Sequence, residues 1–115
     1  MPDLEVAPVR LQHGARPEEP VVEVQVEVLR LHSLRSLTAR AAGHGPGPEA
    51  SIDKLLMTAA EQTLLDTAVT ALGARGVNDP SWFDQYLYSR AASIYGGTSE
   101  IQKGIIAQRL LGMPR

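Results

Sequence analysis

The chain has 115 residues, of which 43% are apolar and 21% charged, with a formal net charge of -2 and no cysteine. This is the composition of one small globular domain. It disfavours a nucleic-acid interface, because the basic residues do not gather in a patch that could neutralise phosphates. The lack of cysteine excludes disulfides, thiolate zinc sites and thiol nucleophiles. No run approaches the roughly 20 apolar residues of a membrane-spanning helix, and the start lacks the features of a signal peptide, so we expect a soluble, cytoplasmic protein.

The first 20 residues contain four prolines, and their apolar residues keep neither the helical nor the strand period. Residues 1–19 are therefore predicted to form an irregular lead-in. After it, the alternating valines of residues 21–28 would favour a half-buried strand on local physics alone. The period then changes, because apolar residues recur at steps of three and four from Leu31 to Ala41. We predict one amphipathic helix over residues 21–42.

Residues 43–48 concentrate three glycines and two prolines, which predicts a connection between helices. From residue 49 to residue 72 a wide apolar stripe at helical spacing predicts a long helix, and Gly73 suits the left-handed residue that ends it. Four members of this stripe could line a pocket for an acyl chain, but we interpret them as helix-packing core. They are Leu55, Leu56, Met57 and Leu64.

Residues 73–80 form another break, rich in glycine and ending on a proline. Either Asp79 or Ser81 can cap the short helix that follows, which runs to Arg90.

Gly96 and Gly97 interrupt the chain once more. Ser99 and Gln102 have the spacing of a capping box, which predicts a final helix through Leu111. The sequence thus indicates four helices and no strand, an all-α helical bundle.

Residues 93–103 read Ser-Ile-Tyr-Gly-Gly-Thr-Ser-Glu-Ile-Gln-Lys, and residues 105–112 continue Ile-Ile-Ala-Gln-Arg-Leu-Leu-Gly. This segment closely resembles the C-terminal signature of acyl-CoA dehydrogenases, and residues 47–56 and 82–92 also resemble the segments before that signature. The resemblance implies that residues 20–115 form part of the C-terminal four-helix domain of such an enzyme, without its first helix.

The physical chemistry of the motif agrees with a ligand site. A Gly96–Gly97 turn lets backbone approach a ligand without a Cβ clash, and the helix opening near Ser99 offers unpaired N–H groups and a partial positive charge to an anionic group. The alternative is structural, because a glycine turn followed by a Ser or Thr cap is also how many helices start.

The resemblance assigns roles to these positions. It implies FAD as the cofactor and an acyl-CoA thioester as the substrate, which would lie beside Gly97. The residues expected to bind the cofactor are Thr98, Ser99, Glu100 and Gly73, and those expected to bind the substrate are Gly96 and Gly97.

Two departures from the family pattern bear on activity. Many members carry the glutamate that removes the α proton of the acyl-CoA where this chain has Gly96, which cannot act as a base. Glu100 is no obvious substitute, since it suits a charge that stabilises the helix start. We therefore assign no catalytic residue. In the loop of residues 70–77, Thr70 and Ala74 replace a Gln and a Gly of many members, so a plain helix-ending turn competes with cofactor contact.

The remaining polar residues suggest no further site. His13, His32 and His44 are too dispersed for metal-ligand spacing, so we expect no metal. Glu23 and Glu27 have the spacing of a solvated helix face.

By resemblance, the parent protein is an oxidoreductase of fatty acid metabolism, a flavoprotein that dehydrogenates an acyl-CoA thioester. This chain would contribute flavin-facing and subunit-contact surface and would be inactive alone. The alternative is a non-catalytic subunit or remnant that acts as a helical oligomerisation module. Under either reading we expect a homo-oligomer or a complex with a related subunit, because the helices would otherwise expose their apolar stripes.

Overall fold

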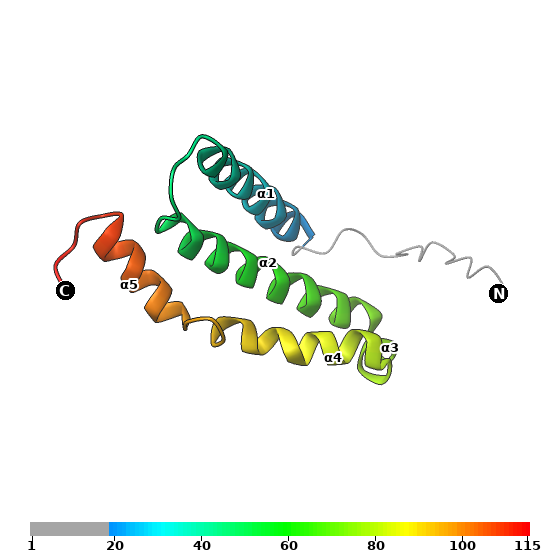
Figure 1. The fold of residues 1–115 in the computed structure, drawn as a ribbon. Coiled ribbons are helices and arrows are strands. Elements are labelled where there is room, and N and C mark those ends of the chain that lie inside the picture. Colours follow the sequence, from blue (N-terminus) through cyan, green and yellow to red (C-terminus); the bar gives the residue numbers. More distant parts are fainter. Residues whose placement is uncertain (1–18) are drawn as a thin grey trace.

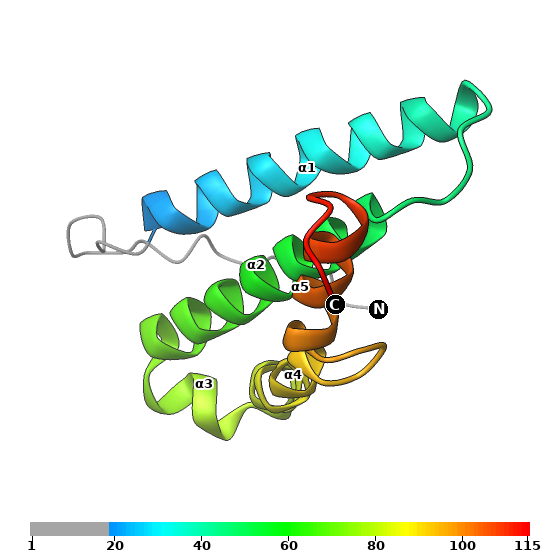
Figure 2. The ribbon, with the colours of Figure 1, turned by 90° about the vertical axis from the view of Figure 1, so that its left-hand side faces the viewer.

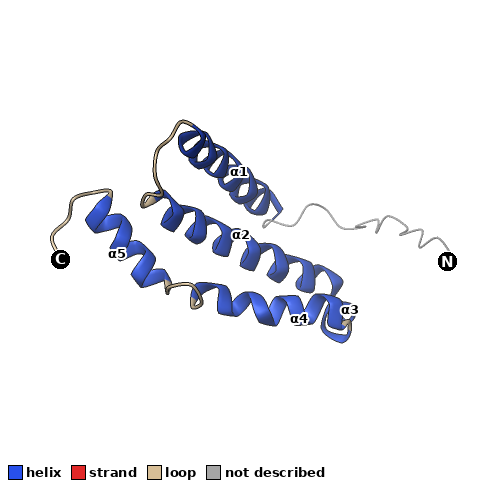
Figure 3. Ribbon diagram, viewed as in Figure 1, coloured by secondary structure: helices blue, strands red, loops and turns tan. Residues whose placement is uncertain are grey.

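The computed structural model describes residues 19–115, and Figures 1 and 3 show that every regular element in this range is a helix. The elements are α1 (Glu19–Ala41), α2 (Glu49–Leu72), α3 (Ala74–Asn78), α4 (Pro80–Ser89), the 3-10 helix η1 (Arg90–Ser93) and α5 (Ser99–Arg109). The expected all-α fold is confirmed for these residues. The predicted lead-in of residues 1–19 lies outside the described residues, except for its last residue, Glu19.

Helix α1 shows how tertiary packing overrides local propensity. Its valine run alternates as a strand would, yet it is helical and packs along α2 (Figure 1). Packing decides between helix and strand here, because the propensities of a residue such as valine for the two structures differ by less than about 1 kcal/mol. His32 and Ser33 reinforce the contact, since the Nδ1 of His32 lies 2.7 Å and the Oγ of Ser33 lies 3.3 Å from the carboxylate of Asp53.

Helix α2 is the centre of the array. Helix α1 lies antiparallel on one side of it, while α4, η1 and α5 return along another side (Figures 1 and 2). The side-chain bonds record this direction, because later residues of α2 meet earlier residues of the returning segment. The Oγ1 of Thr58 donates to the carbonyl of Ala92 at 3.3 Å, and the Nε2 of Gln62 donates to the carbonyl of Ser89 at 2.8 Å.

Small residues bring the returning segment close to α2. Ser89 and Ala92 are completely buried, whereas Ala60 and Leu65 on α2 are 4% and 7% exposed. Among residues 20–115, Ala60, Leu65 and Ala92 are the only apolar residues that are fully buried. The array is therefore open, and large apolar side chains lie at its surface. Two of them, Met57 and Leu64, are 40% and 47% exposed, so their assignment to the core was wrong.

The first glycine-rich break contains an element that the sequence reading missed. Gly73 ends α2 as predicted, with φ +58° and its N–H bonded to the carbonyl of Val69 at 3.0 Å. The following residues form the short helix α3 instead of a loop. Gly76 allows this because a Cβ there would lie 2.8 Å from the carbonyl oxygen of Val69.

Asp79 is the cap of α4, which settles the choice between two candidates. Its carboxylate accepts from the backbone N–H of Ser81 at 2.9 Å and from the Ser81 hydroxyl at 2.6 Å. These hydrogen bonds, with a smaller effect of the Arg75 charge, lower the pKa of the Asp79 carboxyl.

The start of α5 corrects the predicted capping box. Thr98 is the N-cap, and its Oγ1 accepts from the N–H of Ile101 at 3.3 Å. Ser99 is already the first helical residue, and the side chain of Gln102 turns to a carbonyl of the preceding turn. Thr98 is the cap because its extended backbone, with φ -62° and ψ 163°, places its hydroxyl beside the third helical N–H. The helix ends at Arg109, before the predicted Leu111.

Candidate functional site

The candidate site is built on the glycine turn between η1 and α5. Gly96 and Gly97 have φ of +65° and +98°, in the left-handed region that side-chain-bearing residues rarely adopt. A Cβ on Gly97 would also lie 2.7 Å from the Nε2 of Gln102. The backbone conformation therefore favours glycine at the second position, and a side chain there would also displace the end of the Gln102 side chain.

Two side chains from different helices hold this turn by its carbonyl groups. The Nε2 of Gln102, a residue 8% exposed on α5, donates to the carbonyl of Gly96 at 2.8 Å. The Nζ of Lys54, from α2, donates to the carbonyl of Gly97 at 2.6 Å. Both carbonyls of the turn are thus engaged by side chains of the same chain.

The N–H groups of residues 96–100 form a run of free donors. Within residues 19–115, none of these five groups is bonded to an acceptor of the chain, and the first paired N–H after them is that of Ile101. Free N–H groups at a helix start, together with the helix dipole, favour an anionic or strongly polar oxygen. The arrangement can bind a phosphate, a carboxylate or a polarised carbonyl oxygen.

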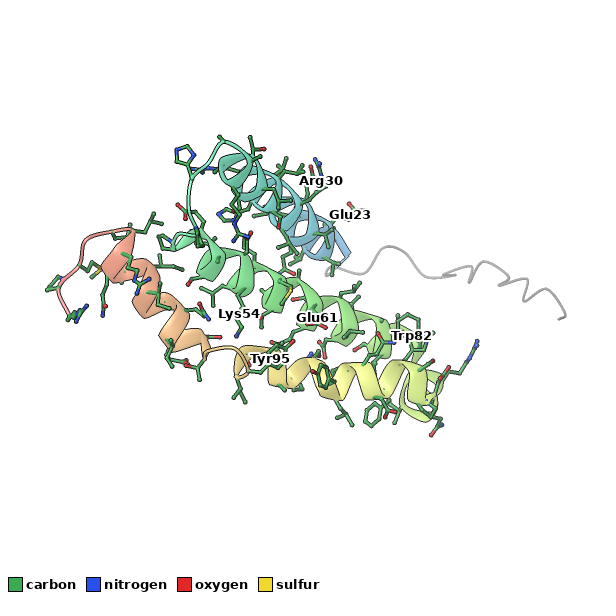
Figure 4. The ribbon with its side chains drawn as sticks, viewed as in Figure 1. Glu23, Arg30, Lys54, Glu61, Trp82 and Tyr95 are labelled. Carbon is green, nitrogen blue, oxygen red and sulfur yellow. The ribbon has the colours of Figure 1, made fainter. Side chains whose placement is uncertain are left out.

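Tyr95 forms one wall beside the turn. The Nζ of Lys54 lies 5.6 Å from the centroid of the Tyr95 ring, and Figure 4 shows the two side chains meeting between α2 and the returning segment. The Tyr88 ring is 6.0 Å from it at a tilt of 32°. Loss of solvation around the hydroxyl raises the pKa of Tyr95, and the negative charge of Glu61 and the neighbouring Tyr88 raise it further.

An apolar groove of about 380 Å³ runs from Tyr95 between α1 and α2. One carboxylate, that of Glu61, lies among its lining residues, which the sequence reading did not single out. The signal was present in the spacing, because Glu61 follows Met57 by four residues and precedes Leu64 by three, on one helix face. The groove is lined by Val26, Leu29, Met57, Ala60, Glu61, Leu64 and Tyr95.

The predicted site residues fall into two separate places. Gly96, Gly97, Thr98, Ser99 and Glu100 share the turn and the first turn of α5. Gly73 lies at the far end of α2, about 28 Å along the helix from Lys54 at 1.5 Å per residue. One copy of the chain therefore does not bring Gly73 to the glycine turn.

Other polar clusters considered from the sequence have structural partners. Glu27 and Arg30 form an exposed ion pair with an N–O distance of 2.6 Å. His44 hydrogen-bonds the carbonyl of Ala39 at 3.0 Å, and His32 joins α1 to α2. Residues 19–115 contain no group of three or more potential metal-ligating side chains placed to hold an ion, and no helix among them is long and apolar enough to cross a membrane.

Comparison with known proteins identifies the relatives of this chain. Residues 21–111 match the family described as acyl-CoA dehydrogenase, C-terminal domain. The chain is 38% identical over 94 residues to acyl-CoA dehydrogenase IpdE1 of Mycobacterium tuberculosis, covering 74% of this chain and 24% of that protein. It is 34% identical over 95 residues to acyl-CoA dehydrogenase IpdE1 of Mycolicibacterium smegmatis, covering 78% and 23%.

A further similarity, 32% over 73 residues, is to acyl-CoA dehydrogenase FadE34 of Mycobacterium tuberculosis, covering 64% of this chain and 10% of that protein. No solved structure gave a significant match. The chain spans about a quarter of the length of the IpdE1 relatives. Because the family match covers most of its length, the chain belongs to the acyl-CoA dehydrogenase family and corresponds to the C-terminal domain of its members.

Proposed function

We propose that residues 20–115 act as a C-terminal domain that completes the flavin and acyl-CoA site of an acyl-CoA dehydrogenase and forms contacts between its subunits. The run of free N–H groups from Gly96 to Glu100 is the observation that carries this proposal. It lies on the family motif, and its donors suit the oxygen atoms of a phosphate, a ribityl chain or a thioester carbonyl.

The residues of the turn would contact the substrate or the cofactor according to their position. Gly96 and Gly97 would let the acyl thioester approach the backbone, where a Cβ would obstruct it. Thr98, Ser99 and Glu100 would face the FAD at the positive end of α5, and Lys54 would keep the turn in place through the carbonyl of Gly97. Bound FAD would supply the acceptor for the hydride that leaves the acyl chain.

Gly73 would contact the site of a neighbouring subunit and not the site of its own chain. Its exposed turn at the far end of α2 has open space around the position of a Cβ, and it could approach the dinucleotide held by a neighbouring subunit. We assign no base to this chain, because the position that carries the glutamate in many members is Gly96. The chain alone is therefore expected to be inactive.

A second candidate function is a helical oligomerisation module without a catalytic role. The observation that favours it is the exposure of large apolar side chains on every long helix, with only three apolar residues fully buried among residues 20–115. A domain so open needs a partner to remove this surface from water. The absence of a carboxylate at Gly96 is consistent with the same reading.

A chimera separates the two functions. In it, residues 21–111 replace the matching C-terminal segment of the Mycobacterium tuberculosis IpdE1 relative. The enzyme reading expects a folded chimera that retains FAD, visible in its absorption spectrum, and loses it on Gly97→Ala but not on the control Gly104→Ala, whose Cβ would meet open space. A folded, oligomeric chimera without flavin would reject the flavin site and support the oligomerisation module.

A further inference from the structure

A second concave surface lies where the end of α1 meets the start of α2. Its cavity measures about 360 Å³ and is lined only by residues within the range 35–50. Figure 2 shows the connection of residues 42–48 that joins the two helices at this end of the array. Small-molecule sites commonly measure about 300–1,000 Å³. The cavity therefore has the size of a ligand site, and it is separate from the glycine turn, which contributes no residue to it.

Basic groups dominate the charged lining of this cavity. Arg35, Arg40 and His44 line it, against one acidic residue, Glu49. Within residues 19–115 neither arginine forms an ion pair or a side-chain hydrogen bond, since the ion pairs there join other residues. A guanidinium group donates several hydrogen bonds in one plane and matches the oxygens of a carboxylate or a phosphate. Two such groups in one cavity favour an anion with several oxygens.

The end of α1 fixes the position of His44. Gly43 adopts φ +88°, its N–H bonds to the carbonyl of Arg40 at 3.0 Å, and the N–H of His44 bonds to the carbonyl of Ala39 at 3.1 Å. The Nδ1 of His44 also lies 3.0 Å from the Ala39 carbonyl oxygen. Because a carbonyl only accepts, Nδ1 is the donor there. The Nε2 of His44 has no partner within residues 19–115 and can bond to a ligand.

The start of α2 adds positive electrostatic potential to the same cavity. Its N-cap residue is Pro48, and no side chain caps it. The N–H of Glu49 has no acceptor within residues 19–115, and the dipole of a helix of 24 residues places a partial positive charge at this end. The carboxylate of Glu49 folds back over Gly47, where it would meet a Cβ. The chain thus places one negative charge of its own in the cavity.

Ser36 gives an independent indication of a ligand. It lines the cavity, it is only 8% exposed, and its Oγ has no hydrogen-bond partner within residues 19–115. The hydroxyls of Thr38 and Thr63, on the same two helices, each donate to the carbonyl four residues earlier at 2.8 Å. Ser36 does not make this bond. A buried hydroxyl without a partner is rare in folded proteins, and an oxygen atom of a ligand in the cavity would satisfy it.

We propose that this cavity binds the phosphate group of a small phosphate monoester. Arg35 and Arg40 bond to its oxygens, and the Ser36 hydroxyl and the Nε2 of His44 supply two further contacts at the positive end of α2. Three terminal oxygens of a phosphate monoester suit this number of donors better than the two of a carboxylate. The rest of the cavity holds the group that carries the phosphate. Glu49 swings away when the phosphate enters, because two negative charges repel each other.

This inference goes beyond the proposed function and does not depend on it. It involves neither flavin nor the acyl thioester, so the chimera described above can fail while this site stands, and the reverse. A chain that binds phosphate in this cavity but no flavin would uphold this inference and reject the flavin site.

The first test is equilibrium dialysis of the full 115-residue chain against inorganic phosphate and glucose 6-phosphate, with glucose as the uncharged control. We expect saturable binding of both phosphates and none of glucose. Tighter binding of glucose 6-phosphate would show that the carrying group adds contacts, whereas equal affinities would show that the phosphate supplies them all. No saturable binding of either phosphate, or equal binding of glucose, would overturn the inference.

Two charge variants test which residues hold the phosphate. Arg40→Gln should weaken the binding at least about 10-fold, because it removes charged donors. The control is Arg75→Gln, which removes an exposed arginine on α3 and should have no effect. Glu49→Gln should tighten the binding about threefold, because it removes the repulsion. Equal effects of the two arginine variants, or weaker binding by Glu49→Gln, would reject this cavity as the site.

Two further variants separate this site from a structural role and from the glycine turn. Ser36→Ala should weaken phosphate binding without lowering the midpoint of urea denaturation in phosphate-free buffer, since the hydroxyl has no partner in residues 19–115. A lower midpoint with unchanged binding would contradict its role. Gly97→Ala should leave phosphate binding unchanged, because Gly97 lies outside the cavity. Loss of binding in Gly97→Ala would place the phosphate at the glycine turn and overturn the inference.

Discussion

The Nζ of Lys54 donates a hydrogen bond of 2.6 Å to the carbonyl of Gly97, across 43 residues of sequence. The bond ties the central helix α2 to the glycine turn that precedes α5. The bond from Gln102 to Gly96 engages the other carbonyl of the turn, while the N–H groups of the turn have no acceptor within residues 19–115.

Lys54→Met should loosen the glycine turn. The substitution keeps the length of the side chain but removes a hydrogen bond from a charged donor, so we expect the free energy of unfolding to fall by about 1–2 kcal/mol. Urea denaturation measures this loss, and hydrogen exchange should quicken selectively at Ile101 and Gln102, whose N–H groups bond to Thr98 beside the turn. Lys103→Met is the control, because Lys103 is an exposed lysine on α5. Equal effects of the two variants would show that Lys54 does not hold the turn.

Thr98→Ala should destabilise the start of α5, whereas Ser99→Ala should not. The Thr98 hydroxyl accepts from the N–H of Ile101, and loss of an N-cap costs about 1 kcal/mol. Ser99 lies inside the helix, where Ala is the better helix former. Thermal unfolding of both variants decides between them. If Ser99→Ala were the more damaging change, the predicted capping box would be right and the Thr98 cap wrong.

Gly76→Ala should destabilise the contact between α3 and α2. Its Cβ would lie 2.8 Å from the carbonyl oxygen and 3.0 Å from the Cα of Val69, which is backbone that cannot turn aside. Overpacking of this kind costs about 1–3 kcal/mol. Gly104→Ala is the matched control in α5, where a Cβ meets open space and should stabilise the helix by about 0.5–1 kcal/mol. Chemical denaturation should move the two midpoints in opposite directions.

Glu61→Gln should lower the pKa of Tyr95 towards its ordinary value. Loss of solvation raises this pKa first and the Glu61 charge adds to it, so removal of the charge should leave part of the shift. The ring signals of Tyr95, assigned with Tyr95→Phe, report the titration by NMR. Asp66→Asn is the control for an exposed carboxylate on α2. An unchanged Tyr95 pKa in Glu61→Gln would mean that Glu61 does not act on the groove wall.

The same shift gives stability a pH dependence of known sign. Because the pKa of Tyr95 is raised in the folded protein, its contribution to the free energy of unfolding is fully present below the unfolded-state pKa of about 10. Above that pH the unfolded state loses its proton first, so stability should fall as pH rises through the folded pKa. Tyr95→Phe should flatten this alkaline decline, as measured by denaturation at a series of pH values.

The sequence by itself determined the helical class, the two long helices and the family. The apolar stripe of residues 49–72 closed by Gly73 predicts α2 to the residue, because periodicity and a left-handed glycine are local signals. The motif from Tyr95 to Gln102 likewise identifies the family from residue types alone. A helix also forms over the alternating valines, where the leucine spacing further on predicts it and packing along α2 overrides the local strand propensity.

Only the tertiary structure decided how these elements meet. The helix α3 depends on the approach of Gly76 to Val69, and the Lys54 to Gly97 bond depends on the return of the chain along α2, so neither has a local signature. The choice of Thr98 over Ser99 rests on one backbone conformation. The exposure of Met57 and Leu64 was hidden for the same reason, since periodicity shows that a helix face is apolar but not what covers it.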